Sequence, residues 1–194
     1  MAKSSTPMPV APLRDLLAWW KESKVRGAII GGLAVSLISK PRLTRDVDAV
    51  VALDDAVWKA FLKVGRTHGF RSRIPGPLLY AQESRMFVLS HIDSGIEVDV
   101  SIAGIPFEVG VVERAERVKV GRLSVPVATA EDLIVYKAIA GRPQDQNDIA
   151  QLLRHLPHLD LEYVRREVGR FAAMLGLAEI AEELERILLQ GREE

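Results

Sequence analysis

Three aspartates and a pair of glycines are the residues whose types and spacing could do chemistry. Asp46 and Asp48 alternate along residues 42–51, which read as a β-strand, so both carboxylates share one face of it. Side chains two residues apart in a strand lie about 6 to 7 Å from each other, where two carboxylates repel by about 3 kcal/mol at an effective dielectric constant of about 20. A divalent cation relieves this repulsion, and Mg2+ or Mn2+ binds carboxylate and phosphate oxygens together. The pair therefore predicts a metal site.

A third acid is expected on a neighbouring strand. Residues 96–102 follow an Asp-Ser-Gly turn and alternate in the same way, with Ile96, Val98 and Val100 directed to the core. Glu97 and Asp99 share the opposite face, and either could complete a set of three acids. We favour Asp99, which has a valine on both sides.

The glycines predict a site for phosphate. The apolar residues 26–30 read as a buried strand that stops at Gly31 and Gly32. Glycine leaves no side chain between the backbone N–H groups and a ligand, and the N-terminus of the helix expected at residues 33–38 points back at this turn. Ser36 adds a hydroxyl, so these three residues are candidate ligands of a nucleoside triphosphate (NTP). The alternatives are an ordinary tight turn for the glycines and a packing role for Ser36.

These residues resemble a known family. Gly31-Gly32, Asp46-x-Asp48 and Asp99 are similar to the three-acid signature of the polymerase-beta-type nucleotidyltransferase superfamily, and residues 31–36 with 42–48 look most like the AbiEii-type toxins of bacterial type IV toxin-antitoxin systems. The resemblance implies that the three aspartates bind metal and that a nucleoside monophosphate passes from an NTP to a hydroxyl of tRNA or protein. It also implies a cognate antitoxin as a partner.

A helical motif in the second half is similar to that family too. Residues 130–142 and 145–149 match a motif in which a lysine and a following aspartate belong to the active site, which implies roles for Lys137 and Asp145. From the residues alone, Lys137 shares a largely apolar helix face and needs an anionic partner, such as a triphosphate. Asp145 and Asp148 lie three apart on the next helix, and either could orient Lys137 or activate the attacking hydroxyl. The alternatives are a surface lysine and a helix-capping aspartate.

One segment has an uneven charge. Residues 56–82 contain no acid, although the whole chain is balanced at 26 basic and 26 acidic residues. The basic residues of this segment are Lys59, Lys63, Arg66, Arg71 and Arg73. Such a segment could guide RNA or a triphosphate toward the site, and the alternative is a solvated helix and loop.

The pattern of elements predicts an α/β (α+β) fold, a small mixed sheet with flanking helices that carries a nucleotidyltransferase core, followed by a C-terminal helical region. We expect a flexible tail at residues 1–12, the core at 13–128 and the helical region at 129–194. The absence of cysteine excludes disulfides and thiolate metal sites, and no apolar stretch is long enough to span a membrane. A cytoplasmic protein without a membrane partner is expected.

Two other functions fit the same residues. A catalytically inactive fold could bind a nucleotide or a partner, although such a module has no need for three converging acids. A small-molecule nucleotidyltransferase, such as those acting on aminoglycoside antibiotics, would share the active site and differ in its acceptor pocket.

Overall fold

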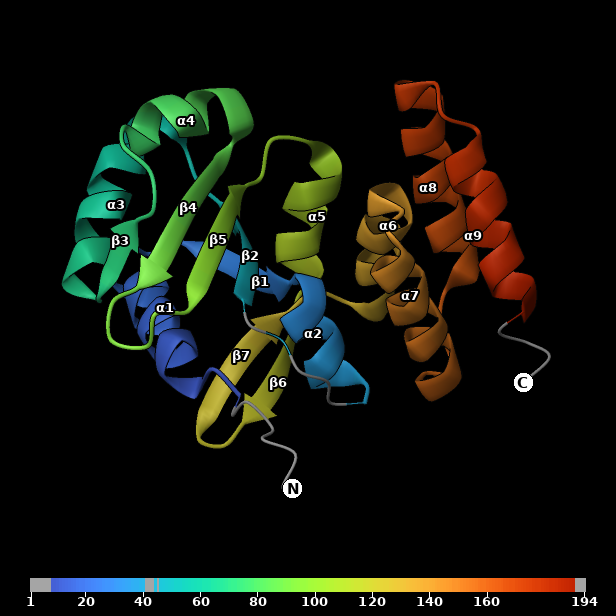
Figure 1. Cartoon of the computed structure of the whole chain (residues 1–194), viewed down its shortest axis with the longest axis horizontal. Coiled ribbons are helices and arrows are strands. Elements are labelled where there is room, and N and C mark those ends of the chain that lie inside the picture. Colours follow the sequence, from blue (N-terminus) through green and yellow to red (C-terminus); the bar gives the residue numbers. More distant parts are fainter. Residues whose placement is uncertain (1–7, 41–43, 45, 191–194) are drawn as a thin grey trace. The chain divides into compact units, whose positions relative to one another are not determined.

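The computed structural model describes residues 8–40, 44 and 46–190, which form two compact units (Figure 1). Unit 1 comprises Met1–Leu33 and Arg42–Ala128, and unit 2 comprises Ala34–Pro41 and Thr129–Glu194. No helix within these described residues is both long and apolar enough to cross a membrane.

Unit 1 is built on a seven-stranded sheet with the order β3-β4-β5-β2-β1-β7-β6. The strands are β1 (Arg26–Ile30), β2 (Asp46–Ala52), β3 (Phe70–Ser72), β4 (Met86–His91), β5 (Glu97–Ile102), β6 (Glu116–Val120) and β7 (Leu123–Val127). Strand β2 runs parallel to β5, β1 runs parallel to β7, and the remaining neighbours are antiparallel. The predicted mixed sheet is confirmed.

Helices pack against this sheet around a mainly aliphatic core that includes a cluster of aromatic rings. The helices are α1 (Val10–Glu22), the short 3-10 helix η1 (Asp55–Val57), α3 (Trp58–Thr67), α4 (Pro77–Ser84) and α5 (Pro106–Arg114). Trp19 of α1 is fully buried and stacks on Phe61 of α3 with a centroid separation of 4.2 Å, and it lies 5.2 Å from the ring of Phe70 on β3. The indole N–H of Trp19 donates to the backbone oxygen of Phe61 at 2.8 Å, so this buried polar group is satisfied.

Three boundaries differ from the sequence prediction. Helix α1 begins at Val10, so Val10–Pro12 of the expected tail are helical, whereas residues 1–7 lie outside the described residues. Helix α2 (Gly31–Ile38) begins at the glycines themselves, two residues earlier than expected. Strand β2 begins at Asp46, although the prediction began at residue 42; Thr44 is not in a strand, and residues 41–43 and 45 lie outside the described residues.

Unit 2 contains the predicted C-terminal helices. These are α6 (Ala130–Ala140), α7 (Pro143–His155), α8 (Leu161–Leu175) and α9 (Glu179–Gln190). The hydroxyl of Thr129 caps α6 by accepting from the backbone N–H of Asp132 at 3.2 Å. Gly141 and Gly176 end α6 and α8 with φ values of +65° and +70°, which favour glycine at these helix C-caps.

Candidate active site

The strand register brings four carboxylates to one face of the sheet. Asp48 on β2 is the partner of Asp99 on β5, and Asp46 is the partner of Glu97. Register partners on neighbouring strands point to the same side, and the intervening residues Val47 and Val98 are fully buried on the other side. We call this side of the sheet, with Asp46, Asp48, Glu97 and Asp99, the acid face. Its acids lie on β2 and β5, at the centre of the sheet.

The close approach of Asp48 requires glycine at position 31. The φ of Gly31, +66°, lies in the left-handed region, and a Cβ built on this residue would lie 2.7 Å from Cγ and 2.8 Å from Cβ of Asp48. Real side chains do not tolerate such distances, so only glycine meets both the conformation and the space at this position. The consequence is that the carboxylate of Asp48 lies directly against the backbone where β1 ends and α2 begins.

The other two predicted phosphate ligands follow on α2. Gly32 lies in its first turn and is partly exposed, as Gly31 is. Ser36 is the sixth residue of the helix and is 4% exposed. Ser36 therefore lies beyond the first turn, where the unpaired N–H groups of a helix are found, and its contact with phosphate stays a prediction.

Arg73 is a site residue that the sequence reasoning did not single out. Its guanidinium forms an ion pair with Glu97 at 2.8 Å and a second ion pair with Asp99, and its Nε–H donates to the backbone oxygen of Leu89 at 3.0 Å. The backbone N–H of Arg73 also bonds to Val88, so the residue continues the pairing of β3 with β4. The acid face therefore already binds a cation, supplied by the chain itself.

The donor set suits a hard divalent cation. The acids of β2 and β5 offer carboxylate oxygens only, which are the ligands that Mg2+ prefers, and their pairing with Arg73 shows that the face attracts positive charge. Within the described part of the chain, no group of three or more His, Cys, Asp or Glu side chains is already arranged around a metal-sized point. Metal ligation by Asp46, Asp48 and Asp99 would thus involve a rearrangement of these side chains, and it stays a prediction.

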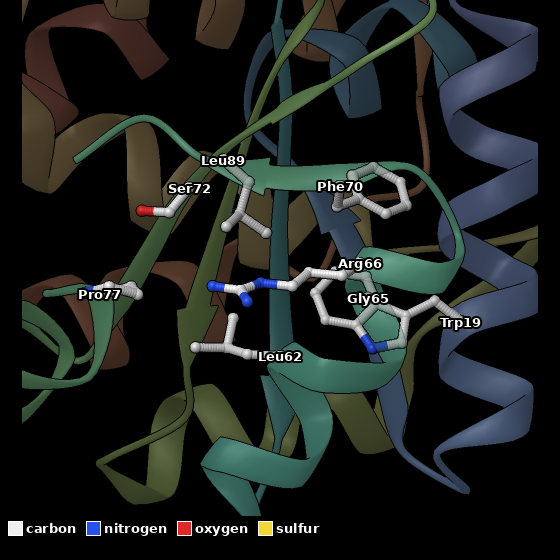
Figure 2. A pocket seen from close by; sticks show the side chains of 8 residues that line it. All are labelled: Trp19, Leu62, Gly65, Arg66, Phe70, Ser72, Pro77 and Leu89. Atoms are coloured by element: carbon white, nitrogen blue, oxygen red, sulfur yellow. The ribbon is translucent and has the colours of Figure 1, made fainter. Parts of the chain in front are cut away.

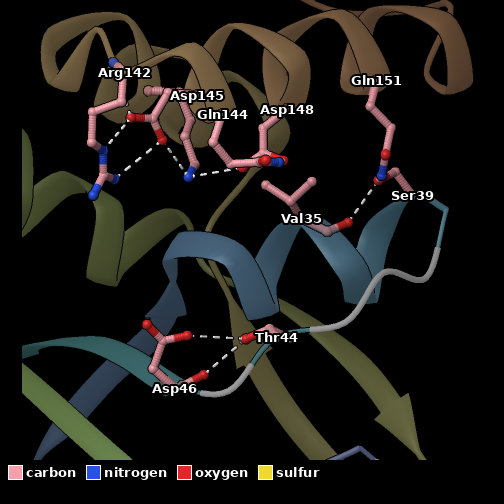
Figure 3. A network of polar contacts seen from close by, with 10 residues as sticks. Val35, Ser39, Thr44, Asp46, Arg142, Gln144, Asp145, Asp148 and Gln151 are labelled. Carbon is pink, nitrogen blue, oxygen red and sulfur yellow. Dashed lines mark hydrogen bonds and ion pairs between the residues drawn. The ribbon is translucent and has the colours of Figure 1, made fainter. Parts of the chain in front are cut away.

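Asp145 and Asp148, labelled in Figure 3, form a buried ionic cluster with Lys137 within unit 2. The ammonium group of Lys137 lies 2.7 Å from Asp145 and 2.9 Å from Asp148, while the side chains of all three residues are at most 7% exposed. Arg142 pairs with the second oxygen of Asp145 at 2.6 Å, and Gln144 donates to Asp148 at 3.3 Å. Two cations thus balance two anions, and Asp145 and Asp148 share the contact with Lys137, so geometry does not separate their roles.

The environment of Asp145 lowers its pKa. Burial acts to raise the pKa of this carboxyl, but the hydrogen bonds and charges of Arg142 and Lys137 outweigh burial and hold the pKa below its ordinary value. Asp145 also accepts from the backbone N–H of Arg142 at 3.3 Å, which caps the first turn of α7. The carboxylate is therefore the charged form in neutral solution and is part of the structure of unit 2.

A mixed sheet whose central parallel strands carry facing aspartates, beside a glycine turn that leads into a helix, defines a protein of the nucleotidyltransferase fold. The sequence bears this out, and the chain belongs to the family described as Nucleotidyltransferase of unknown function (DUF6036), which it matches over residues 20–184.

Solved structures share this fold. The solution structure of the antibiotic-resistance factor ANT(2'')-Ia superposes with a TM-score of 0.63 at 15% identity, covering 88% of this chain and 95% of that one. An antigenic nucleotidyltransferase-like protein from Paracoccidioides brasiliensis gives 0.53 at 17% identity, covering 94% and 95%. The lincosamide antibiotic adenylyltransferase LnuA, with lincomycin bound, gives 0.50 at 14% identity, covering 72% and 94%. No curated protein sequence matches this chain.

Proposed function

We propose that the protein is a metal-dependent nucleotidyltransferase that moves a nucleoside monophosphate from an NTP to a hydroxyl acceptor. The observation that carries the proposal is the facing of Asp48 and Asp99 on parallel strands, with the carboxylate of Asp48 against Gly31. Strand β1 ends in the same row of the sheet, because Ile30 is the register partner of Asp48. This shared position supports the proposal that these acids bind a metal and that the backbone after β1 binds phosphates.

Each residue has a stated role in this proposal. Asp46 and Asp48 would hold Mg2+ or Mn2+, Asp99 would complete the metal site and help to deprotonate the acceptor, and Gly31 and Gly32 would bind the triphosphate through their backbone N–H groups. A bound cation would neutralise charge on the phosphates and on the leaving pyrophosphate. The acceptor oxygen forms a bond to the α-phosphorus as the bond to pyrophosphate breaks, and the hydroxyl proton passes to a carboxylate.

The motif residues of unit 2 are a separate part of the proposal. The resemblance gives Lys137 and Asp145 a place in the active site, and Ser36 was predicted to add a hydroxyl. Their surroundings support a structural role as well, because Lys137 is already paired with two carboxylates in its own unit. A Lys137→Met variant that folds and still binds an NTP would confine Lys137 to that structural role.

The acceptor is the least constrained part of the reaction. The resemblance to AbiEii-type toxins favours tRNA or a protein hydroxyl, a cognate antitoxin and a cytoplasmic location. A small-molecule acceptor is the second candidate, because the fold superposes on an antibiotic-resistance factor and on a lincosamide antibiotic adenylyltransferase. Incubation with each α-labelled NTP, Mg2+ and either total RNA, total protein or an antibiotic panel tests these together.

The control for this assay is Asp48→Asn, which preserves the shape of the side chain beside Gly31. Label transferred by the wild type and not by the variant supports the proposal, and the labelled product names the acceptor class. If neither protein transfers label while both bind NTP equally, the protein is a binding module and the proposal is wrong.

A further inference from the structure

A pocket of about 510 Å³ opens at the β3 edge of unit 1. Its walls come from the end of α3, strand β3, the loop that leads into α4, and Ile92 after β4. Sites for small molecules usually enclose about 300–1,000 Å³, so the pocket is large enough for a ligand group such as a nucleotide. The proposed reaction uses none of the residues that line it.

Two arginines line this pocket without partners. Arg66 and Arg71 are both exposed, and among the described residues neither guanidinium has a hydrogen bond or a carboxylate partner. Figure 2 shows a narrower recess that shares four of the lining residues, in which the side chain of Arg66 extends past Leu62 and Leu89 toward the side formed by Ser72 and Pro77. The cationic end of Arg66 is therefore presented to the pocket.

The rest of the lining adds apolar surface and no negative charge. Ile74, Pro75, Pro77 and Ile92 form apolar walls, and no acid occurs in the lining or anywhere in residues 56–82. Helix α4 begins at this pocket, and no side chain caps its first turn. A ligand that combines anionic groups with apolar rings matches this chemistry, whereas a polycationic antibiotic would be repelled by it.

The pocket lies at the β3 edge of the sheet, where its two faces meet. Phe70 and Ser72 face the side of the buried Val47 and Val98, whereas Arg71 faces the side of the acids. Arg71 is the register partner of Ser90, which pairs with Glu97, which in turn pairs with Asp46, so all four residues lie in one row across the sheet. Strand β3 is two strands away from β5, which corresponds to about 10 Å. This is too far for the reacting group of a small acceptor held in the pocket. It fits a chain whose end reaches the acids while the preceding one or two residues lie at the pocket.

We propose that this pocket binds the single-stranded 3′ end of a nucleic-acid acceptor, with Arg66 and Arg71 contacting its phosphates. The inference rests on the proposed function, because it places the terminal hydroxyl of the strand at Asp48 and Asp99. Single-stranded nucleic acid is bound by cationic grooves that follow its backbone together with apolar surface for its bases. RNA and DNA share this chemistry, and the two arms of the test distinguish them.

The test is filter binding of a 5′-labelled single strand with a free 3′ hydroxyl, as RNA and as DNA of the same sequence, to the full chain over a range of salt. The variant is Arg66→Gln with Arg71→Gln. The matched control is Lys119→Gln with Arg122→Gln, which removes the same charge from the β6–β7 hairpin at the other edge of the sheet and from two exposed positions.

We expect the pocket variant to bind roughly tenfold or more weakly in low salt, with the slope of log K against log salt smaller by about 1.4, because each lost phosphate contact accounts for about 0.7. We expect the control to stay within about twofold of the wild type, because it loses the same charge but keeps both arginines of the pocket. If RNA binds more tightly than DNA, the acceptor is RNA; the reverse result identifies DNA.

Three results of the binding assay would overturn the inference. They are equal weakening by both double variants, competition by polyglutamate as effective as that by the strand, and no strand binding by the wild type. If the wild type transfers label to a small molecule or protein and the pocket variant transfers it equally well, the proposed function stands and the inference is wrong. With a nucleic-acid acceptor, the pocket variant should raise KM while kcat at saturation is unchanged.

Discussion

Asp48 and Asp99 are direct register partners on the parallel strands β2 and β5. Neighbouring strands are about 4.8 Å apart, whereas Asp46 and Asp48 are separated by about 6.6 Å along one strand, so the closer pairing of acids is the one between strands. A cation held by Asp48 and Asp99 would therefore link the two central strands of the sheet. Binding at this face and stability of unit 1 should then depend on each other.

The first prediction concerns this linkage. Asp48→Asn should abolish nucleotidyl transfer and should also abolish the rise in melting temperature that Mg2+ and NTP give the wild type, because a ligand that binds only the folded state stabilises it. Without metal, the free energy of unfolding should change by less than about 1 kcal/mol, since carboxylate repulsion is relieved. Thermal melts with and without ligand measure both effects. Asp93→Asn, in the exposed turn before β5, is the control and should melt as the wild type does in both conditions.

The second prediction concerns Arg73. Its guanidinium pairs with Asp99 and Glu97, so a divalent cation at Asp99 has to compete with it. Arg73→Gln should bind Mn2+ more tightly in the absence of nucleotide, by up to about fivefold, because a partly exposed ion pair is worth up to about 1 kcal/mol. Electron paramagnetic resonance of free Mn2+ measures this affinity. Arg71→Gln removes the same charge from the same face without breaking a carboxylate contact and should have a much smaller effect; an equal effect would refute direct competition.

The third prediction concerns Gly31. Gly31→Ala should destabilise the protein by about 2 to 4 kcal/mol and weaken NTP binding, because the alanine methyl would meet the side chain of Asp48 in a left-handed backbone conformation. Gly95 is a close control, since its φ is +69° but a Cβ there meets nothing within 4 Å. Gly95→Ala should therefore cost only the backbone strain, about 1 kcal/mol, and leave NTP binding unchanged. Urea unfolding and calorimetric NTP titration measure the two effects, and similar losses in both variants would show that the contact with Asp48 is unimportant.

The fourth prediction is a pH dependence in unit 2. Because the folded state lowers the pKa of Asp145 below the ordinary value of 3.8, the carboxylate adds stability at pH values above 3.8, and this stability is lost as the pH falls through the lower, folded-state pKa. Asp145→Asn should destabilise the protein by about 2 kcal/mol at neutral pH, and the difference should shrink as the pH falls below about 4. Urea unfolding followed by far-ultraviolet circular dichroism at several pH values measures it. Glu179→Gln, exposed in the same unit, should give a difference of a few tenths of a kcal/mol. A difference for Asp145→Asn that does not vary with pH would contradict the assignment.

The central strands and the acid face could be predicted from sequence because their signal is local. Alternation of aspartate with buried aliphatic residues places Asp46, Asp48 and Asp99 on one side of their strands, and the structure has β2 and β5 where this pattern predicts them. The order of β2 beside β5, which makes Asp48 and Asp99 partners, depends on pairing between distant segments and has no local signal.

The ion pairs of Arg73 with Glu97 and Asp99 could not be predicted from the sequence for a related reason. Strand β3 has only the three residues Phe70–Ser72, which is too short for periodicity to show, and α4 has a weakly amphipathic sequence. Without β3, nothing brings Arg73 near Asp99, although Arg73 was noted as part of a basic segment. The narrower resemblance to AbiEii-type toxins likewise depends on the acceptor, which the nucleotidyltransferase family match does not specify.

The stack of Trp19 on Phe61 gives the protein a natural optical reporter. The sequence has three tryptophans, Trp19, Trp20 and Trp58, and all of them belong to unit 1, where they are at most 5% exposed. Selectively excited tryptophan emission thus follows unit 1 alone, and unit 2 is silent in the same spectrum. Emission that changes before the helical signal, or after it, would show that the two units unfold separately, and no label would have to be attached to see it.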